Sequence, residues 1–195
     1  MVRLGTFISL MLFMSGLSAQ DDDHEYASIH SSDLEAVRDL LIFDVETLSG
    51  ETVQILGRID STRPPKVFIV SFLAEWCEHC NYEAPFLAKL YSTWRKKGLE
   101  MAAIFEYSER EKSQEFMRRY GLSMPFYFGE IRGKLQGKRD ITAHYRLRTR
   151  LADERGWGTP FHLLFVGDDV KNLYYVAGEF VEEELIKFLG ERLGE

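Results

Sequence analysis

The chain has 195 residues, of which 45% are hydrophobic and 28% are charged. This composition is typical of a globular protein with a core and excludes a disordered chain. The formal net charge of −7 gives no electrostatic basis for binding nucleic acid. Only two cysteines are present, which excludes a small scaffold stapled by several disulfides.

Residues 1–19 have the order of a secretory signal peptide. Arg3 gives a positive start, an apolar run follows over residues 4–14, and small residues precede the acidic stretch that begins at Asp21. This is the arrangement of a cleaved export signal. The apolar run is short for a membrane span, although an uncleaved anchor remains the alternative. We therefore expect a periplasmic or otherwise exported protein.

The next segment, residues 20–35, is polar and acidic with few apolar anchors. It is expected to form a loose leader in which His24 and His30 are solvated. Residues 36–195 are then expected to fold as one domain, because their length suffices for a single core.

The pattern of the domain predicts an α/β fold. Residues 41–56 alternate apolar and polar side chains around a Ser-Gly turn, which predicts a β-hairpin. Residues 66–74 form a continuous β-branched and aromatic run, as in a buried central strand. Residues 77–98 have helical spacing, and Pro85 inside them is expected to kink the helix. The other expected elements are a strand at 99–107, a helix at 108–121, a short strand or turn at 124–128, a short helix at 141–147, a hairpin at 159–180 that turns at Gly-Asp-Asp, and a helix at 181–193. This order predicts a mixed central sheet covered by helices on both faces.

The two cysteines form a Cys-x-x-Cys pair at the start of the expected helix. A helix N-terminus carries partial positive charge and unpaired N–H groups, which stabilise a thiolate at Cys77. The thiolate is the nucleophile of disulfide exchange. Cys80, one turn further in, is placed to attack the mixed disulfide. A protonated His79 would lower the pKa of the thiol further, and Glu78 would oppose it.

Other functions of the pair are a metal site or a vestigial redox motif in a binding module. Cys77 and Cys80 with His79 or His162 would suit copper or zinc in a metal-binding or delivery protein. However, His79 lies between the cysteines, where joint ligation is awkward, and a structural zinc site needs four ligands. Asn81 excludes covalent haem attachment, which needs a histidine at that position. No cofactor and no resident metal are expected.

The stretch Phe-Leu-Ala-Glu-Trp-Cys-Glu-His-Cys at residues 72–80 resembles the active-site segment of thioredoxin-fold proteins. The longer pattern, which includes the leading hairpin and residues 118–128, 144–147 and 158–169, resembles the TlpA/ResA-like group of exported thiol–disulfide oxidoreductases. The resemblance implies a thioredoxin-like fold with an N-terminal β-hairpin. It also implies an enzyme that exchanges its disulfide with protein thiols or disulfides of exported proteins and draws electrons from a membrane donor.

The resemblance extends to further site residues. Pro160, preceded by Thr159, occupies the place of the cis-proline that packs against the redox pair and receives an extended substrate segment. Trp76 matches a packing residue at the rim of the pair. Glu83 matches a carboxylate near the pair, and its spacing places it on the helix face of both cysteines. A partly buried glutamate would shuttle the proton of Cys80, whereas an exposed one would only support the helix dipole.

Two departures from the group bear on the direction of electron flow and on the substrate. Thioredoxin has a buried aspartate where this chain has Ser71, which favours Glu83 as the proton carrier. Reducing members often have Glu-Pro or Gly-Pro between the cysteines, whereas histidine in the third place is typical of more oxidising relatives and isomerases. A reductase, for example one that acts on apocytochrome c, is therefore implied by family analogy alone, and the opposite direction stays open.

The separation from the first cysteine to the proline is 83 positions (160 − 77), longer than is usual in the group. The excess lies in residues 129–140 and 148–158, an insertion before the cis-proline that is a candidate for substrate selection. The segment from Arg118 to Arg155 contains ten basic and four acidic residues, a local balance of +6 that leaves −13 for the remainder. It is either a solvated insertion or a contact surface for an acidic partner.

Overall fold

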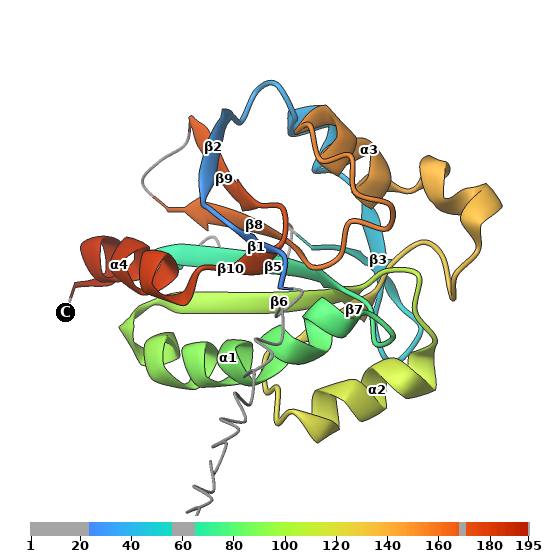
Figure 1. The fold of residues 1–195 in the computed structure, drawn as a ribbon, viewed down its shortest axis with the longest axis horizontal. Coiled ribbons are helices and arrows are strands. Elements are labelled where there is room, and N and C mark those ends of the chain that lie inside the picture. Colours follow the sequence, from blue (N-terminus) through green and yellow to red (C-terminus); the bar gives the residue numbers. More distant parts are fainter. Residues whose placement is uncertain (1–23, 56–64, 168–170, 195) are drawn as a thin grey trace, which may run out of the picture.

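The computed structural model describes residues 24–55, 65–167 and 171–194 (Figure 1). The expected signal peptide at residues 1–19 and the aspartates of the expected Gly-Asp-Asp turn lie outside these residues. None of the helices in the described ranges is both long enough and apolar enough to cross a membrane.

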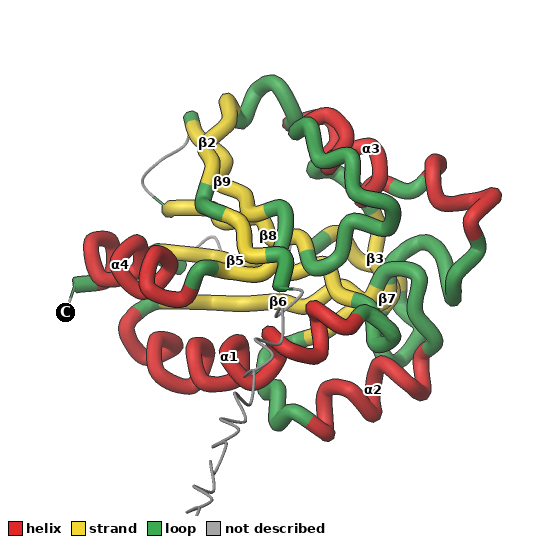
Figure 2. Tube along the Cα trace, viewed as in Figure 1, coloured by secondary structure: helices red, strands yellow, loops and turns green. Residues whose placement is uncertain are grey.

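A mixed sheet of eight strands organises the described part of the chain (Figures 1 and 2). The strand order is β2-β9-β8-β5-β6-β7-β3-β4. β5 pairs in parallel with β6, and β6 with β7, whereas the other neighbours are antiparallel. The strands are β2 His30–Asp33, β3 Asp44–Glu46, β4 Thr52–Gln54, β5 Val67–Leu73, β6 Leu99–Phe105, β7 Phe126–Phe128, β8 Phe161–Val166 and β9 Asn172–Val176.

The central strand β5 explains why the sheet needs cover on both faces. All seven of its side chains are buried, which requires an apolar layer above and below the strand. One core cluster joins the sheet to α1, α2 and α4, and a second joins the opposite face to α3. Figure 2 shows α1 and α3 on opposite sides of the strands. The helices are α1 Glu78–Trp94, α2 Arg110–Arg119, α3 Ala143–Arg150 and α4 Glu182–Leu193. The predicted α/β fold with a covered mixed sheet is confirmed.

The N-terminal hairpin is also confirmed. β3 and β4 pair antiparallel around a turn in which Gly50 has φ 87°, a conformation that favours glycine. Helix α1 continues through Pro85, although the proline removes one backbone hydrogen bond.

The expected loose leader is wrong for its described part. β1, Tyr26–Ala27, pairs in parallel with β10, Glu179–Phe180, and β2 pairs antiparallel with β9 along four residues. Gly178 allows this approach, because a Cβ there would lie 2.2 Å from the carbonyl oxygen of Glu25. A polar strand at a sheet edge gains backbone hydrogen bonds without burying apolar side chains, so the segment is ordered despite its composition.

Buried polar side chains of α3 hold the backbone of the insertion before Pro160. His144 is buried, and its Nε2 lies 3.2 Å from the carbonyl oxygen of Gly158. Arg148, 1% exposed, donates to the carbonyl oxygens of Asp153, Arg155 and Gly156 at 2.6 to 3.1 Å. The interpretation of the basic segment as a solvated insertion is therefore wrong for Arg148, which is internal to the fold.

Candidate active site

Cys77 is the N-cap residue of α1. Its extended backbone (φ −76°, ψ 121°) turns the chain from the loop after β5 into the helix. The backbone N–H of Cys80 donates to Sγ of Cys77 at 3.3 Å, so sulfur satisfies a helix N–H that would otherwise lack a partner. Both cysteines are free thiols. The expected contact of the first sulfur with the helix N-terminus is present.

The loop before β8 closes the site on the other side. The Thr159–Pro160 peptide bond is cis, as the resemblance implied. The thiol of Cys77 donates to the carbonyl oxygen of Thr159 at 3.3 Å. The backbone of this loop therefore lies against the first sulfur.

The two thiols have opposite electrostatic surroundings. The hydrogen bond with the Cys80 side chain, the backbone N–H of Cys80 and the charge of His79 lower the pKa of Cys77 from 9.0 to about 7, although burial opposes them. Burial, together with the neighbouring sulfur and the charge of Glu83, raises the pKa of Cys80 well above 9.0. The surroundings thus favour the thiolate at Cys77 and the protonated thiol at Cys80.

The pH dependence of alkylation tests this difference. Because the thiolate is the reactive form, the rate at which reduced protein reacts with iodoacetamide is expected to rise with pH through a midpoint near the pKa of about 7 at Cys77. Mass spectrometry of digested protein should find the first adduct at Cys77. A midpoint near 9, or equal labelling of Cys80, would contradict the assignment.

Behind the pair lies a buried chain of polar groups that links α1 to β8 and β5. Glu83 is 4% exposed, and its Oε1 accepts the backbone N–H of Phe180 at 2.8 Å. Its Oε2 lies 3.1 Å from Nε2 of His162, without the alignment of a hydrogen bond. Nδ1 of His162 lies 2.9 Å from the hydroxyl of Ser71. The exposed alternative for Glu83 is thus wrong.

The sequence did not reveal the contact of His162 with Glu83. The metal-binding alternative makes this residue a ligand, but its position on a strand is more typical of a core histidine, and the side chain is fully buried. Its place follows from the register of β5 and β8, which sets Ser71 opposite His162. Strand register between distant segments leaves no local signal in the sequence.

The residues between the cysteines differ in their contacts. Glu78 is exposed, and its carboxylate accepts the Tyr82 hydroxyl at 2.6 Å. His79 instead turns toward β10, with Nδ1 2.9 Å from Oε1 of Glu179. Glu179 also contacts Nδ1 of His24 at 2.8 Å. The expectation that His24 is solvated is therefore wrong.

Trp76 forms a rim with the insertion. Its indole N–H donates to the carbonyl oxygen of Tyr107 at 2.9 Å, and its ring meets the Trp157 ring edge-on at 5.4 Å. Nζ of Lys134 lies 3.8 Å from the centre of the Trp76 ring. Trp157 was not singled out from the sequence, because an aromatic residue in a glycine-rich loop has no periodic pattern around it.

The metal-binding alternative gains no support. Among the described residues, no group of three or more histidine, cysteine, aspartate or glutamate side chains is arranged to hold a metal ion. The imidazoles that the alternative requires are turned elsewhere: His79 contacts Glu179 and His162 contacts Glu83.

The fold and the paired thiols define a thioredoxin-like protein. A thiol:disulfide interchange protein DsbE from Chlorobium tepidum has a TM-score of 0.54 at 18% identity, with 88% of this chain and 99% of that chain covered. A secreted disulfide oxidoreductase of Mycobacterium tuberculosis, homologous to DsbE of E. coli, has a TM-score of 0.51 at 19% identity and covers 80% of this chain and 96% of its own. At these identities the likeness concerns the fold.

Residues 38–155 match the AhpC/TSA family, and the chain belongs to that thioredoxin-like family. It is similar to the thiol-disulfide oxidoreductase ResA of Halalkalibacterium halodurans, with 31% identity over 83 residues that make up 43% of this chain and 44% of the relative. The chain thus spans less than half the length of this curated relative. The predicted resemblance to ResA-like proteins is confirmed.

Proposed function

We propose that this protein is a thiol–disulfide oxidoreductase that exchanges a Cys77–Cys80 disulfide with protein thiols. The observation that carries the proposal is the position of Cys77, whose sulfur lies between the first turn of α1 and the carbonyl oxygen of Thr159. The names of the ResA relatives support the same activity.

In the reducing direction, the Cys77 thiolate attacks one sulfur of a substrate disulfide. A mixed disulfide forms, and the other substrate sulfur leaves as a thiolate that takes up a proton. Cys80 then loses its proton and attacks the sulfur of Cys77, so that the second substrate thiol is released and the Cys77–Cys80 disulfide forms. Two electrons pass from the protein to the substrate. The reverse sequence oxidises a substrate dithiol.

Glu83 is the group we propose as proton acceptor for Cys80. Its charge acts on Cys80, and its carboxylate lies within the buried chain that continues to His162 and Ser71. A buried base is needed because Cys80 is fully buried and has no direct path for its proton into water.

Loss of this carboxylate is expected to slow the second step. A Glu83→Gln variant keeps the shape of the side chain and is expected to resolve mixed disulfides about a hundredfold more slowly, the effect of losing a general base, while Cys77 alkylation stays fast. Single-turnover quenching with acid measures the step. Glu111→Gln, which removes an exposed carboxylate from α2, is the matched control. Equal resolution rates in both variants would contradict the role.

The substrate side of the site is proposed from the same geometry. The backbone at Thr159 and Pro160 would pair with an extended segment of the substrate, and Trp76 would line the entrance. The exposed Lys134, Lys138 and Arg146 are the cations of the basic segment that we propose for contact with an acidic partner. Arg148 is excluded from this role because its charge is directed inward.

The finer proposal is an exported reductase. We propose that residues 1–19 direct export, that a membrane protein returns electrons, and that exported proteins, including apocytochrome c, are the substrates. This rests on analogy with the TlpA/ResA-like group.

The test mixes reduced protein with a disulfide-bonded peptide and oxidised protein with the same peptide as a dithiol. The reduction potential of the Cys77–Cys80 pair distinguishes the two directions. A reductase is expected to have a potential near that of thioredoxin, about −270 mV, and an oxidase a potential near that of DsbA, about −120 mV. Failure of exchange in both directions would overturn the proposed function.

A further inference from the structure

We propose that Glu179, together with His24 and Glu25 of the N-terminal segment, is a clasp that positions His79 beside the nucleophilic sulfur of Cys77. The inference rests on the proposed function, since it assigns a role in preparing that nucleophile. The N-terminal strand would then contribute to the redox site by holding His79 in place.

The centre of the clasp is the carboxylate of Glu179. The residue is 2% exposed. Its Oε1 lies 2.9 Å from Nδ1 of His79 and accepts the backbone N–H of Glu25 at 3.0 Å, and its Oε2 lies 2.8 Å from Nδ1 of His24. Two imidazoles from segments far apart in the sequence thus share one buried carboxylate. A buried carboxylate is stable when its neighbours donate or carry positive charge.

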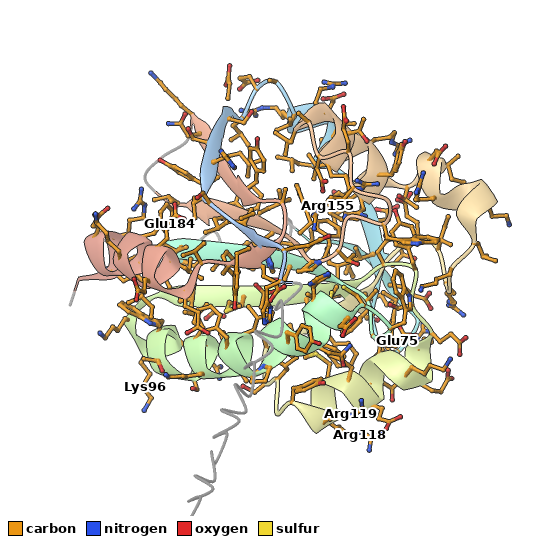
Figure 3. The ribbon with its side chains drawn as sticks, viewed as in Figure 1. Glu75, Lys96, Arg118, Arg119, Arg155 and Glu184 are labelled. Carbon is orange, nitrogen blue, oxygen red and sulfur yellow. The ribbon has the colours of Figure 1, made fainter. Side chains whose placement is uncertain are left out.

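Glu25 forms the solvent-exposed side of the clasp and contacts both His79 and Arg155. Oε1 of Glu25 lies 3.9 Å from Nε2 of His79, and its Oε2 lies 3.2 Å from Nη1 of Arg155. Arg155 also donates to the carbonyl oxygen of Pro160 at 3.0 Å. Figure 3 shows Arg155 near the middle of the molecule. The clasp therefore joins the helix that carries the cysteines to the loop that carries the cis-proline.

The backbone fixes the clasp in register. β1 and β10 pair so that Tyr26 lies opposite Glu179, and the N–H of Glu179 donates to the carbonyl oxygen of Glu25 at 2.9 Å. The ring of Tyr82 on α1 lies 4.9 Å from the ring of His24 and 6.5 Å from that of His79. The N-terminal segment is thus held against the first turn of the redox helix.

The chemical consequence concerns the charge next to Cys77. The contact of Nδ1 with Glu179 fixes the position of the His79 ring, and the charge of His79 lowers the pKa of Cys77. The charged groups that face His79 are Glu179 of β10 and Glu25 of the N-terminal segment, with Cys77 and Glu78 on its own side of the site. Loss of the Glu179 carboxylate should therefore release His79 from this position and make Cys77 a poorer nucleophile.

The experiment measures iodoacetamide alkylation of the reduced full-length protein against pH. Glu179→Gln is expected to move the Cys77 midpoint upward by about half a pH unit, which is about threefold slower labelling at pH 6. Glu25→Gln, at a side chain that is 48% exposed, is expected to shift the midpoint in the same direction by less. It serves as the second variant if Glu179→Gln does not fold.

A matched control separates charge from strand docking. Glu184 of α4, labelled in Figure 3, accepts the backbone N–H of Ile29 at 3.1 Å. Glu184→Gln removes a contact of the same N-terminal segment and has no contact with His79 among those of the described residues. It is expected to leave the midpoint unchanged. A shift as large as that of Glu179→Gln would show that docking of the strand alone matters and would overturn the proposal.

A double-mutant comparison provides the decisive readout. In a His79→Ala background, Glu179→Gln is expected to leave the midpoint unchanged or to lower it, because only the direct effect of removing a negative charge remains. An upward shift as large as in the parent would overturn the inference. Alkylation requires only a reduced thiol and does not depend on disulfide exchange. If the variants shift the alkylation midpoint as expected but the unmodified protein exchanges no disulfide, the result counts against the proposed function and not against the clasp.

Discussion

Cys77→Ser is expected to abolish disulfide exchange, and Cys80→Ser is expected to accumulate a mixed disulfide with substrate. Cys77 has the lowered pKa and lies next to the Thr159–Pro160 loop, whereas Cys80 is fully buried and its pKa is raised. Without Cys80 no second thiol attacks the mixed disulfide, so the first covalent complex persists. Non-reducing electrophoresis followed by peptide mass spectrometry would identify the sulfur that is bound.

The double variant with both cysteines replaced by serine is the control for this pair of variants. It should trap nothing, which excludes adducts at other side chains. The assignment of the nucleophile would be contradicted by a substrate adduct on Cys80 in the Cys77→Ser protein. It would also be contradicted by undiminished turnover in either single variant.

Arg148→Met is expected to lower the free energy of unfolding by about 3 kcal/mol, because it leaves buried polar partners without their cation. The guanidinium donates to three carbonyl oxygens in residues 153–156 and lies 3.7 Å from the carboxylate of Asp153. Its side chain also packs closely against Gly158, which has φ 66°. Urea unfolding monitored by circular dichroism measures the change. Residues 153–158 lead to Pro160, so the rate of disulfide exchange should fall as well.

The exposed Arg146 on the same helix provides the control for Arg148. Arg146→Met makes the same chemical change at a solvated position and is expected to alter the free energy of unfolding by less than about 0.5 kcal/mol. Equal effects of the two substitutions would show that the inward hydrogen bonds of Arg148 do not stabilise the insertion.

The parts of the fold that the sequence predicted are those with a strong local pattern. β5 is a run of seven residues, six of them apolar and one a serine, and its burial follows from composition alone. The start of α1 at Glu78 follows from the position of Cys77 before an amphipathic stretch. The helical spacing also placed Glu83 on the helix face that carries both cysteines.

The parts that the sequence did not reveal depend on pairing between distant segments. His162 meets Glu83 because β8 lies beside β5, and Glu179 meets His79 because β10 follows the last hairpin back toward α1. Such contacts are set by strand register and crossover geometry, which leave no periodic trace near either residue. The edge strand β2 escaped prediction for a related reason, since its stability comes from backbone hydrogen bonds to β9.

The most direct test of the central claim is a redox titration of the full-length protein in glutathione buffers, with free thiols counted by alkylation and mass spectrometry. The account predicts that the Cys77 and Cys80 thiols disappear together in one reversible two-electron step that yields an intramolecular disulfide. Retention of both thiols across the whole titration, or a glutathione adduct on one cysteine without closure of the disulfide, would contradict it.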